Sequence, residues 1–139
     1  MKADQINIRD PFILCHDGMY YLYGTDSATT WQGRPEGFNC WTSRDLSEWR
    51  GPFRIFTPDA SFFSDRHYWA PECFHYEGRF FLISTFGAPD RKKGVYILTA
   101  DSPLGPFRPH SDNPLTPPGW ACIDGTVFKN TDERLYLIF

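Results

Sequence analysis

One hairpin pattern recurs along the chain and constrains its fold more than any other feature. The pattern is an apolar segment, a short polar turn and an aromatic or aliphatic segment. It occurs three times, over residues 10–23, 71–83 and 124–138. The turns contain Asp17-Gly18, Glu77-Gly78 and Asp132-Glu133. Asp-Gly favours the left-handed backbone of a tight hairpin turn, and β-branched and aromatic residues favour strands. The pattern therefore predicts three antiparallel hairpins.

The hairpins repeat at a nearly constant spacing. Gly18 and Gly78 lie 60 residues apart, and Gly78 and Glu133 lie 55 residues apart. A second block that ends in Gly-Pro-Phe recurs at residues 41–53 and 98–107. A period of about 50 residues made of short strands is typical of a β-propeller blade. We therefore predict an all-β fold, a β-propeller represented by about two blades and the start of a third.

The number of predicted blades is small for a propeller. Closed rings hold roughly 4–8 blades, and an open arc leaves an unpaired strand edge. We therefore expect residues 1–139 to form a single partial propeller domain that is truncated at its C-terminus, within a longer protein. An open edge also predicts self-association, and a ring completed by self-assembly stays open as an alternative.

Composition excludes several other classes of protein. A net charge of −3 without a basic run argues against a nucleic-acid partner, and no apolar run has membrane-spanning length. Residues 1–7 lack the apolar core of a signal peptide, so the expected location is the cytoplasm. The four cysteines are isolated in the sequence, which indicates free buried thiols instead of a metal site or disulfides. Aromatic residues make up 18% of the chain, which suits sheets and sugar-binding clefts.

Two aspartates occupy equivalent positions in the repeat. Asp10 precedes Pro11, and Asp124 precedes Gly125 in the third hairpin. The proline is expected to hold Asp10 in an extended conformation. Alone, Asp10 would be interpreted as a turn-capping residue. Because the inner strands of a propeller line its channel, two equivalent carboxylates are expected to converge on one site.

Four further residues are candidates for a site, and three of them have a structural alternative. Trp31 lies in a Gly/Pro-rich loop and could stack on a sugar or pack against its own loop. Glu72 lies two residues beyond the blade position of the aspartates, on the same face by strand alternation, and could contact substrate or form a salt bridge. His67 could be a ligand or a proton shuttle, or simply a hydrogen-bonded histidine. Phe86, in an expected charged loop over 84–94, is a candidate substrate contact.

Five motifs in order carry a resemblance to a known family. They are Arg9-Asp10-Pro11, Ser43 to Trp49, Trp69-Ala70-Pro71-Glu72, Asp101 to Phe107 and Ile123 to Phe128. Together they resemble glycoside hydrolase family 43, the five-bladed propeller arabinosidases and xylosidases. The resemblance covers nearly the whole chain. It implies inverting hydrolysis of α-L-arabinofuranosidic or β-D-xylosidic linkages in plant-type polysaccharides or oligosaccharides.

The resemblance also implies roles for individual residues. Asp10 matches the general base, and Asp124 matches the aspartate that raises the pKa of the general acid. The acid itself belongs to the following blade, and no residue of this chain matches it. Trp69 matches an aromatic residue that lines the subsite of the cleaved sugar. The family needs no organic cofactor; relatives hold a structural calcium ion in the complete propeller, but no ligand set for one stands out here.

Two other interpretations stay open. Related propellers that cleave fructosides by a retaining mechanism use an aspartate nucleophile and a Glu-Cys acid/base, which Asp10 and Glu72-Cys73 mimic. In that family, however, the Glu-Cys pair lies one blade later, and the first motif continues as Asn-Gly. The second alternative is an inactive fragment or a carbohydrate-binding propeller without catalytic activity.

Overall fold

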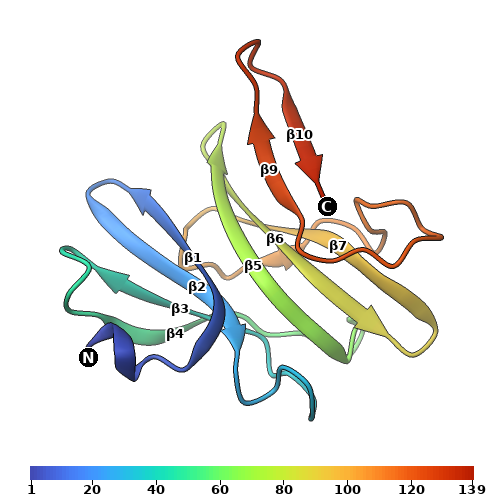
Figure 1. Ribbon diagram of the computed structural model, residues 1–139, viewed down its shortest axis with the longest axis horizontal. Coiled ribbons are helices and arrows are strands. Elements are labelled where there is room, and N and C mark those ends of the chain that lie inside the picture. The colour runs from blue at the N-terminus through green and yellow to red at the C-terminus, as the bar shows by residue number, and fades with distance from the viewer.

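The computed structural model describes residues 1–139 and contains almost only β-strands (Figure 1). The first sheet has four antiparallel strands in chain order, β1 (Ile8–His16), β2 (Met19–Asp26), β3 (Phe38–Ser43) and β4 (Arg50–Phe56). The second repeats this order with β5 (Arg66–Tyr76), β6 (Arg79–Ala88), β7 (Arg91–Ala100) and β8 (Arg108–Pro109). A third, two-stranded sheet pairs β9 (Thr126–Lys129) with β10 (Leu135–Ile138). A short 3-10 helix, η1 (Ala3–Gln5), precedes β1.

Two four-stranded sheets followed by a hairpin confirm the prediction of about two blades and the start of a third. The turns between β1 and β2 and between β5 and β6 have positive φ at both central residues, which a two-residue hairpin turn requires. These residues are Asp17-Gly18 and Glu77-Gly78. The innermost strands β1 and β5 lie next to each other where the two blades meet (Figure 1).

The hydrophobic core lies between the two blades. Fourteen buried residues form one cluster to which both sheets contribute. Its centre is aromatic: the rings of Phe38 and Phe56 from blade 1 contact those of Tyr68 and Phe86 from blade 2. Packing of the blades against each other therefore buries the sheet faces that a single blade would leave in water.

Two sequence-based expectations are wrong in detail. The segment 84–94 is not a loop, because β6 and β7 run through it and only residues 89–90 form the turn. Its charged residues lie at the tip of this hairpin, and charge alone does not separate a long hairpin from a loop. Of the four free cysteines, three are buried, but Cys15 is exposed on β1. Burial raises the pKa of the Cys73 thiol to about 12, so that thiol is protonated at neutral pH.

No helix in the structure has the length and apolar character needed to cross a membrane.

Candidate active site

The site is built on an unusual backbone conformation at one position of the repeat. Asp10, Ala70 and Asp124 have φ angles of 49°, 46° and 56°, all in the left-handed region that non-glycine residues rarely occupy. The predicted equivalence of these positions is therefore confirmed by their geometry. The extended conformation expected for Asp10 before its proline is wrong.

A β-bulge accompanies this conformation in both complete blades. The pairing of β1 with β2 shifts register between Arg9 and Phe12, and that of β5 with β6 shifts between Trp69 and Glu72. A bulge inserts one extra residue and re-aims the side chain there, which is why bulges often lie next to active sites. The strained left-handed residue and its β-bulge are therefore one structural feature that recurs in both blades.

Two buried threonines hold these strained residues. The Thr25 hydroxyl donates to Asp10 Oδ2 at 2.9 Å and accepts from the Ala70 backbone N–H at 2.8 Å. In the next blade, the Thr85 hydroxyl accepts from the Asp124 backbone N–H at 3.0 Å. Each threonine lies on the second strand of its blade; Thr25 reaches Ala70 on the inner strand β5 of the next blade, and Thr85 reaches Asp124 just before β9. The sequence analysis missed both, although their spacing of 60 residues equals the blade period.

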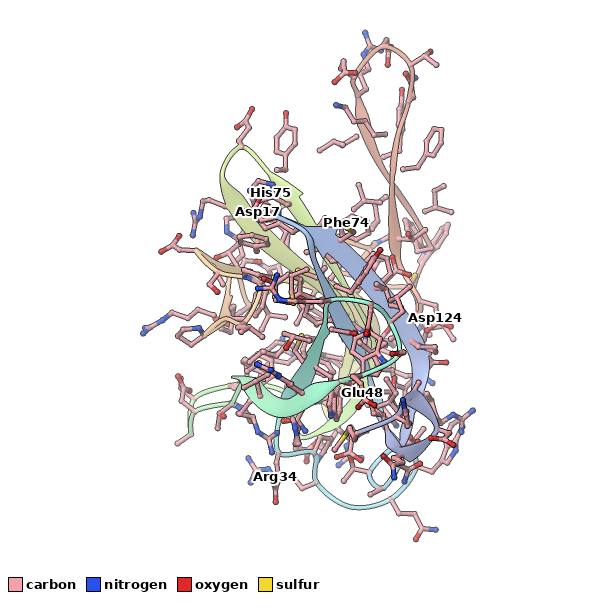
Figure 2. All side chains as sticks on the ribbon, turned by 90° about the vertical axis from the view of Figure 1, so that its left-hand side faces the viewer. Asp17, Arg34, Glu48, Phe74, His75 and Asp124 are labelled. Carbon is pink, nitrogen blue, oxygen red and sulfur yellow. The ribbon has the colours of Figure 1, made fainter.

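Asp10 and Asp124 share one pocket with two tryptophans. The pocket has a volume of about 160 Å³ and is lined by Arg9, Asp10, Thr30, Trp31, Trp69, Ile123 and Asp124. In Figure 2, Asp124 lies beside the ribbon of β1, the strand that carries Asp10. Two carboxylates far apart in the sequence therefore face a single cavity.

The two indole rings meet edge to face in this pocket. Their centroids are 5.3 Å apart, and the Trp69 indole N–H donates to the Thr30 carbonyl at 2.8 Å. Trp69 is thereby fixed, whereas Trp31 is 71% exposed. Of the alternatives for Trp31, the structure places its ring at the pocket and not in packing of its own loop.

Burial and nearby charges shift the pKa of Asp124. Burial first, and then the nearby Asp10 carboxylate, raise the pKa of Asp124 above its ordinary value, while the Lys93 ammonium opposes the shift. Lys93 lies over the Trp69 ring at 4.9 Å, and Arg9 lies over the Trp31 ring at 5.3 Å. The sequence analysis gave no role to either cation.

Two predicted site residues lie elsewhere. Phe86 is fully buried in the core between the blades, so the expected substrate contact is wrong. Glu72 is half-buried, does not line the pocket, and has one buried carboxylate oxygen without a hydrogen-bond partner. The expectation for Glu72 assumed unbroken strand alternation, and the bulge after Trp69 breaks it.

His67 supports the wall of the pocket. Its ring lies 4.5 Å from that of Trp69, and its Nδ1 atom is buried without a hydrogen-bond partner. Burial, with a contribution from Lys93, lowers the pKa of His67. Nδ1 also lies only 2.4 Å from the position that a Cβ atom at Gly87 would take, so a glycine is needed there. The interpretation of His67 as a fully hydrogen-bonded residue does not fit this geometry.

The residues present do not fit a calcium site. No group of three or more His, Cys, Asp or Glu side chains gathers anywhere in the 139 residues. Calcium takes about 6–8 oxygen ligands, commonly including several carboxylates.

The family model of glycosyl hydrolases family 43 matches residues 5–139. The chain belongs to this family. The resemblance noted in the sequence is therefore confirmed.

A solved structure agrees with the fold. An endo-arabinase from Bacteroides thetaiotaomicron superimposes with a TM-score of 0.88 at 33% identity, over 99% of this chain and 46% of that one. Together with the two four-stranded blades, this likeness confirms the predicted β-propeller architecture.

Two curated relatives match by sequence. An extracellular exo-α-(1→5)-L-arabinofuranosidase from Cellvibrio japonicus is 22% identical over 152 residues, which cover 99% of this chain and 41% of that protein. A β-xylosidase from Xylanibacter ruminicola is 35% identical over 78 residues, covering 54% and 23% respectively. The chain thus spans less than half the length of each of these relatives.

Proposed function

We propose that the full-length protein hydrolyses α-L-arabinofuranosidic or β-D-xylosidic linkages of plant-type glycans with inversion of configuration. One observation carries this proposal: Asp10 and Asp124 come from equivalent strained positions in the first and third repeats and face one pocket. Membership of glycosyl hydrolases family 43 supports it, as do relatives named endo-arabinase, arabinofuranosidase and β-xylosidase.

Asp10 acts as the general base. The Thr25 hydroxyl binds its Oδ2 atom, which fixes the carboxylate and leaves Oδ1 to take a proton from water. That water attacks the anomeric carbon from the face opposite the leaving group. Inverting enzymes separate base and acid by roughly 6.5–9.5 Å to make room for this water.

Asp124 acts on the general acid, a carboxylic acid that we expect on the following blade. A negative charge beside a carboxyl group disfavours its ionisation. An ionised Asp124 would therefore keep the acid protonated near neutral pH, ready to protonate the leaving oxygen. The pKa of Asp124 is itself raised, so this effect weakens as the pH falls into the range where Asp124 takes up a proton.

The two indoles bind the sugar. An indole face offers an apolar platform for the C–H groups of a sugar ring. Trp69 is held rigidly by its hydrogen bond to Thr30, and Trp31 presents an exposed ring next to it. The carboxylates at the same pocket are then positioned against the anomeric carbon.

The test is hydrolysis of aryl α-L-arabinofuranoside and aryl β-D-xyloside by the full-length protein, with NMR detection of the first product anomer. We expect turnover of at least one substrate with inversion, and loss of turnover in Asp10→Asn. A retained anomer would favour the two-step mechanism with an aspartate nucleophile. Binding of arabino- or xylo-oligosaccharides without turnover would identify a carbohydrate-binding propeller instead.

A further inference from the structure

A second hollow opens next to the catalytic pocket. It has a volume of about 400 Å³ and shares Thr30 and Trp31 with the catalytic pocket. Its other walls come from the loop before β3, which supplies Arg34, and from the start of β5, which supplies Asp65 and Arg66. We call it the outer hollow. A glycan bound in the catalytic pocket would continue into it past Trp31.

The outer hollow is polar and carries an uncompensated positive charge. Arg66 binds Asp65 through two hydrogen bonds of 2.7 and 3.2 Å, so these two charges cancel. The Arg34 guanidinium forms no ion pair and no hydrogen bond in the structure, and acts on Asp65 only as a more distant charge. One planar group with five N–H donors therefore lines the hollow without a partner.

Two more cations stand beside the two indoles of the catalytic pocket, of which Trp31 also lines the outer hollow. Arg9 lies over Trp31 and Lys93 lies over Trp69, and neither forms an ion pair with a carboxylate. The chain as a whole has a net charge of −3, so this clustering is not a general excess of positive charge. The transition state of glycoside cleavage is itself cation-like, and nearby positive charge does not favour it. Asp10 and Asp124 lie close to Arg9 and Lys93 in the catalytic pocket and offset their charge, so the cation left without a partner is Arg34 in the outer hollow. Its charge indicates a negative group on the ligand.

We propose that the outer hollow binds a uronic acid unit of the glycan, with its carboxylate on Arg34 and its ring against Trp31. Arginine matches a carboxylate with two parallel N–H···O bonds, which a neutral sugar cannot reproduce. Trp31 is 71% exposed and offers the ring surface on which the unit packs. This inference rests on the proposed function, because it assumes that a neighbouring unit of the same glycan occupies the catalytic pocket.

The test compares two matched oligosaccharides. Both have a neutral arabinose or xylose unit at the cleavage site; one bears a glucuronic acid unit next to it, and the other is its carboxyl-reduced, glucose-containing form. Dissociation constants are measured by calorimetry on the catalytically impaired Asp10→Asn protein, and kcat/KM is measured on the wild type. We expect the acidic form to bind about fivefold more tightly, as for an exposed ion pair of about 1 kcal/mol. The preference should decrease with added salt because the pair is near the surface.

Two variants test whether Arg34 causes the preference for the acidic oligosaccharide. Arg34→Gln should abolish the preference while hydrolysis of simple aryl glycosides stays at the wild-type rate. Arg44→Gln removes another exposed arginine that forms no ion pair and lies away from both pockets, and it should keep the preference. Equal affinity for the two forms, or an unchanged preference in Arg34→Gln, would overturn the inference. Failure to hydrolyse the aryl glycosides would instead overturn the proposed function, and the calorimetric comparison would still decide the ligand of the outer hollow.

Discussion

Replacement of Thr25 by valine tests whether one hydroxyl group joins Asp10, the proposed catalytic base, to the neighbouring blade. Valine keeps the shape of threonine but removes the donor to Asp10 Oδ2 and the acceptor for the Ala70 N–H. Thr25 is only 1% exposed, so water cannot readily replace the lost acceptor. An unsatisfied buried group costs about 1–3 kcal/mol, and we expect the free energy of unfolding to fall by about this amount. Urea unfolding followed by tryptophan fluorescence measures it.

The same substitution should affect catalysis through the orientation of Asp10. A base that is less well held spends less time in the reactive geometry, so kcat should fall while KM changes little. We expect about a tenfold fall in kcat, which corresponds to about 1.4 kcal/mol. Thr25→Ser restores the hydroxyl and should restore most of kcat.

Thr85→Val is the matched control within the chain. Thr85 occupies the same position one blade later and accepts from the Asp124 N–H, but the residue equivalent to Asp10 in that blade is Ala70, which has no carboxylate. Thr85→Val should therefore lower stability to a similar extent and lower kcat less. An unchanged kcat in Thr25→Val, an equal fall in both valine variants, or no rescue by serine would refute the reasoning.

Four further predictions follow from the site and the core. Asp10→Asn should reduce kcat to background with little change in the thermal melting temperature, and wild-type turnover in an aryl-glycoside assay would contradict its role as base. Asp124→Asn should lower kcat. It should also raise the free energy of unfolding at pH 7, because folding raises the pKa of Asp124 and ionisation of this carboxyl group therefore opposes folding as pH rises. That stability difference should vanish as pH falls below 3.8, the ordinary pKa of an aspartate, and urea titrations at several pH values would show if it does not. Phe86→Ala should lower the free energy of unfolding by about 3–5 kcal/mol because it empties a fully buried site, and a smaller effect in urea unfolding would mean that the core can collapse around it. Trp31→Ala should raise KM for oligosaccharides with little loss of stability, because the side chain is largely exposed, and an unchanged KM would remove Trp31 from the binding site.

Much of the fold was predictable because the residues that specify the repeat act through local backbone preferences. Asp17-Gly18 and Glu77-Gly78 specify hairpin turns by backbone preference alone, and both turns form as predicted. The equivalence of Asp10 and Asp124 followed from the same register. What these rules share is that the residues concerned are neighbours in sequence or lie a whole number of repeats apart.

The failures arise where a distant contact decides the outcome. Phe86 looked accessible because charged residues follow it, but packing between the blades buries it. Strand alternation predicted that Glu72 lies on the face of the site. A β-bulge, which no residue type in the sequence indicates, breaks this alternation. Neither the partner of a buried ring nor a register shift is encoded in the local sequence.

The conformation of Asp10 shows how contacts between blades can override a local rule. A residue before proline avoids compact conformations, so Asp10 should be extended, yet its φ is 49°. A single exception could be a local accident, but Ala70 has the same conformation before its own proline without any catalytic role. The strain is therefore a property of the blade and not of the aspartate. Thr25 forms hydrogen bonds with both residues, so contacts between the blades hold the strained backbone in place. The aspartate at this position lines the pocket. A carboxylate at any equivalent position would be presented in the same way, and two of the three positions in this chain carry one.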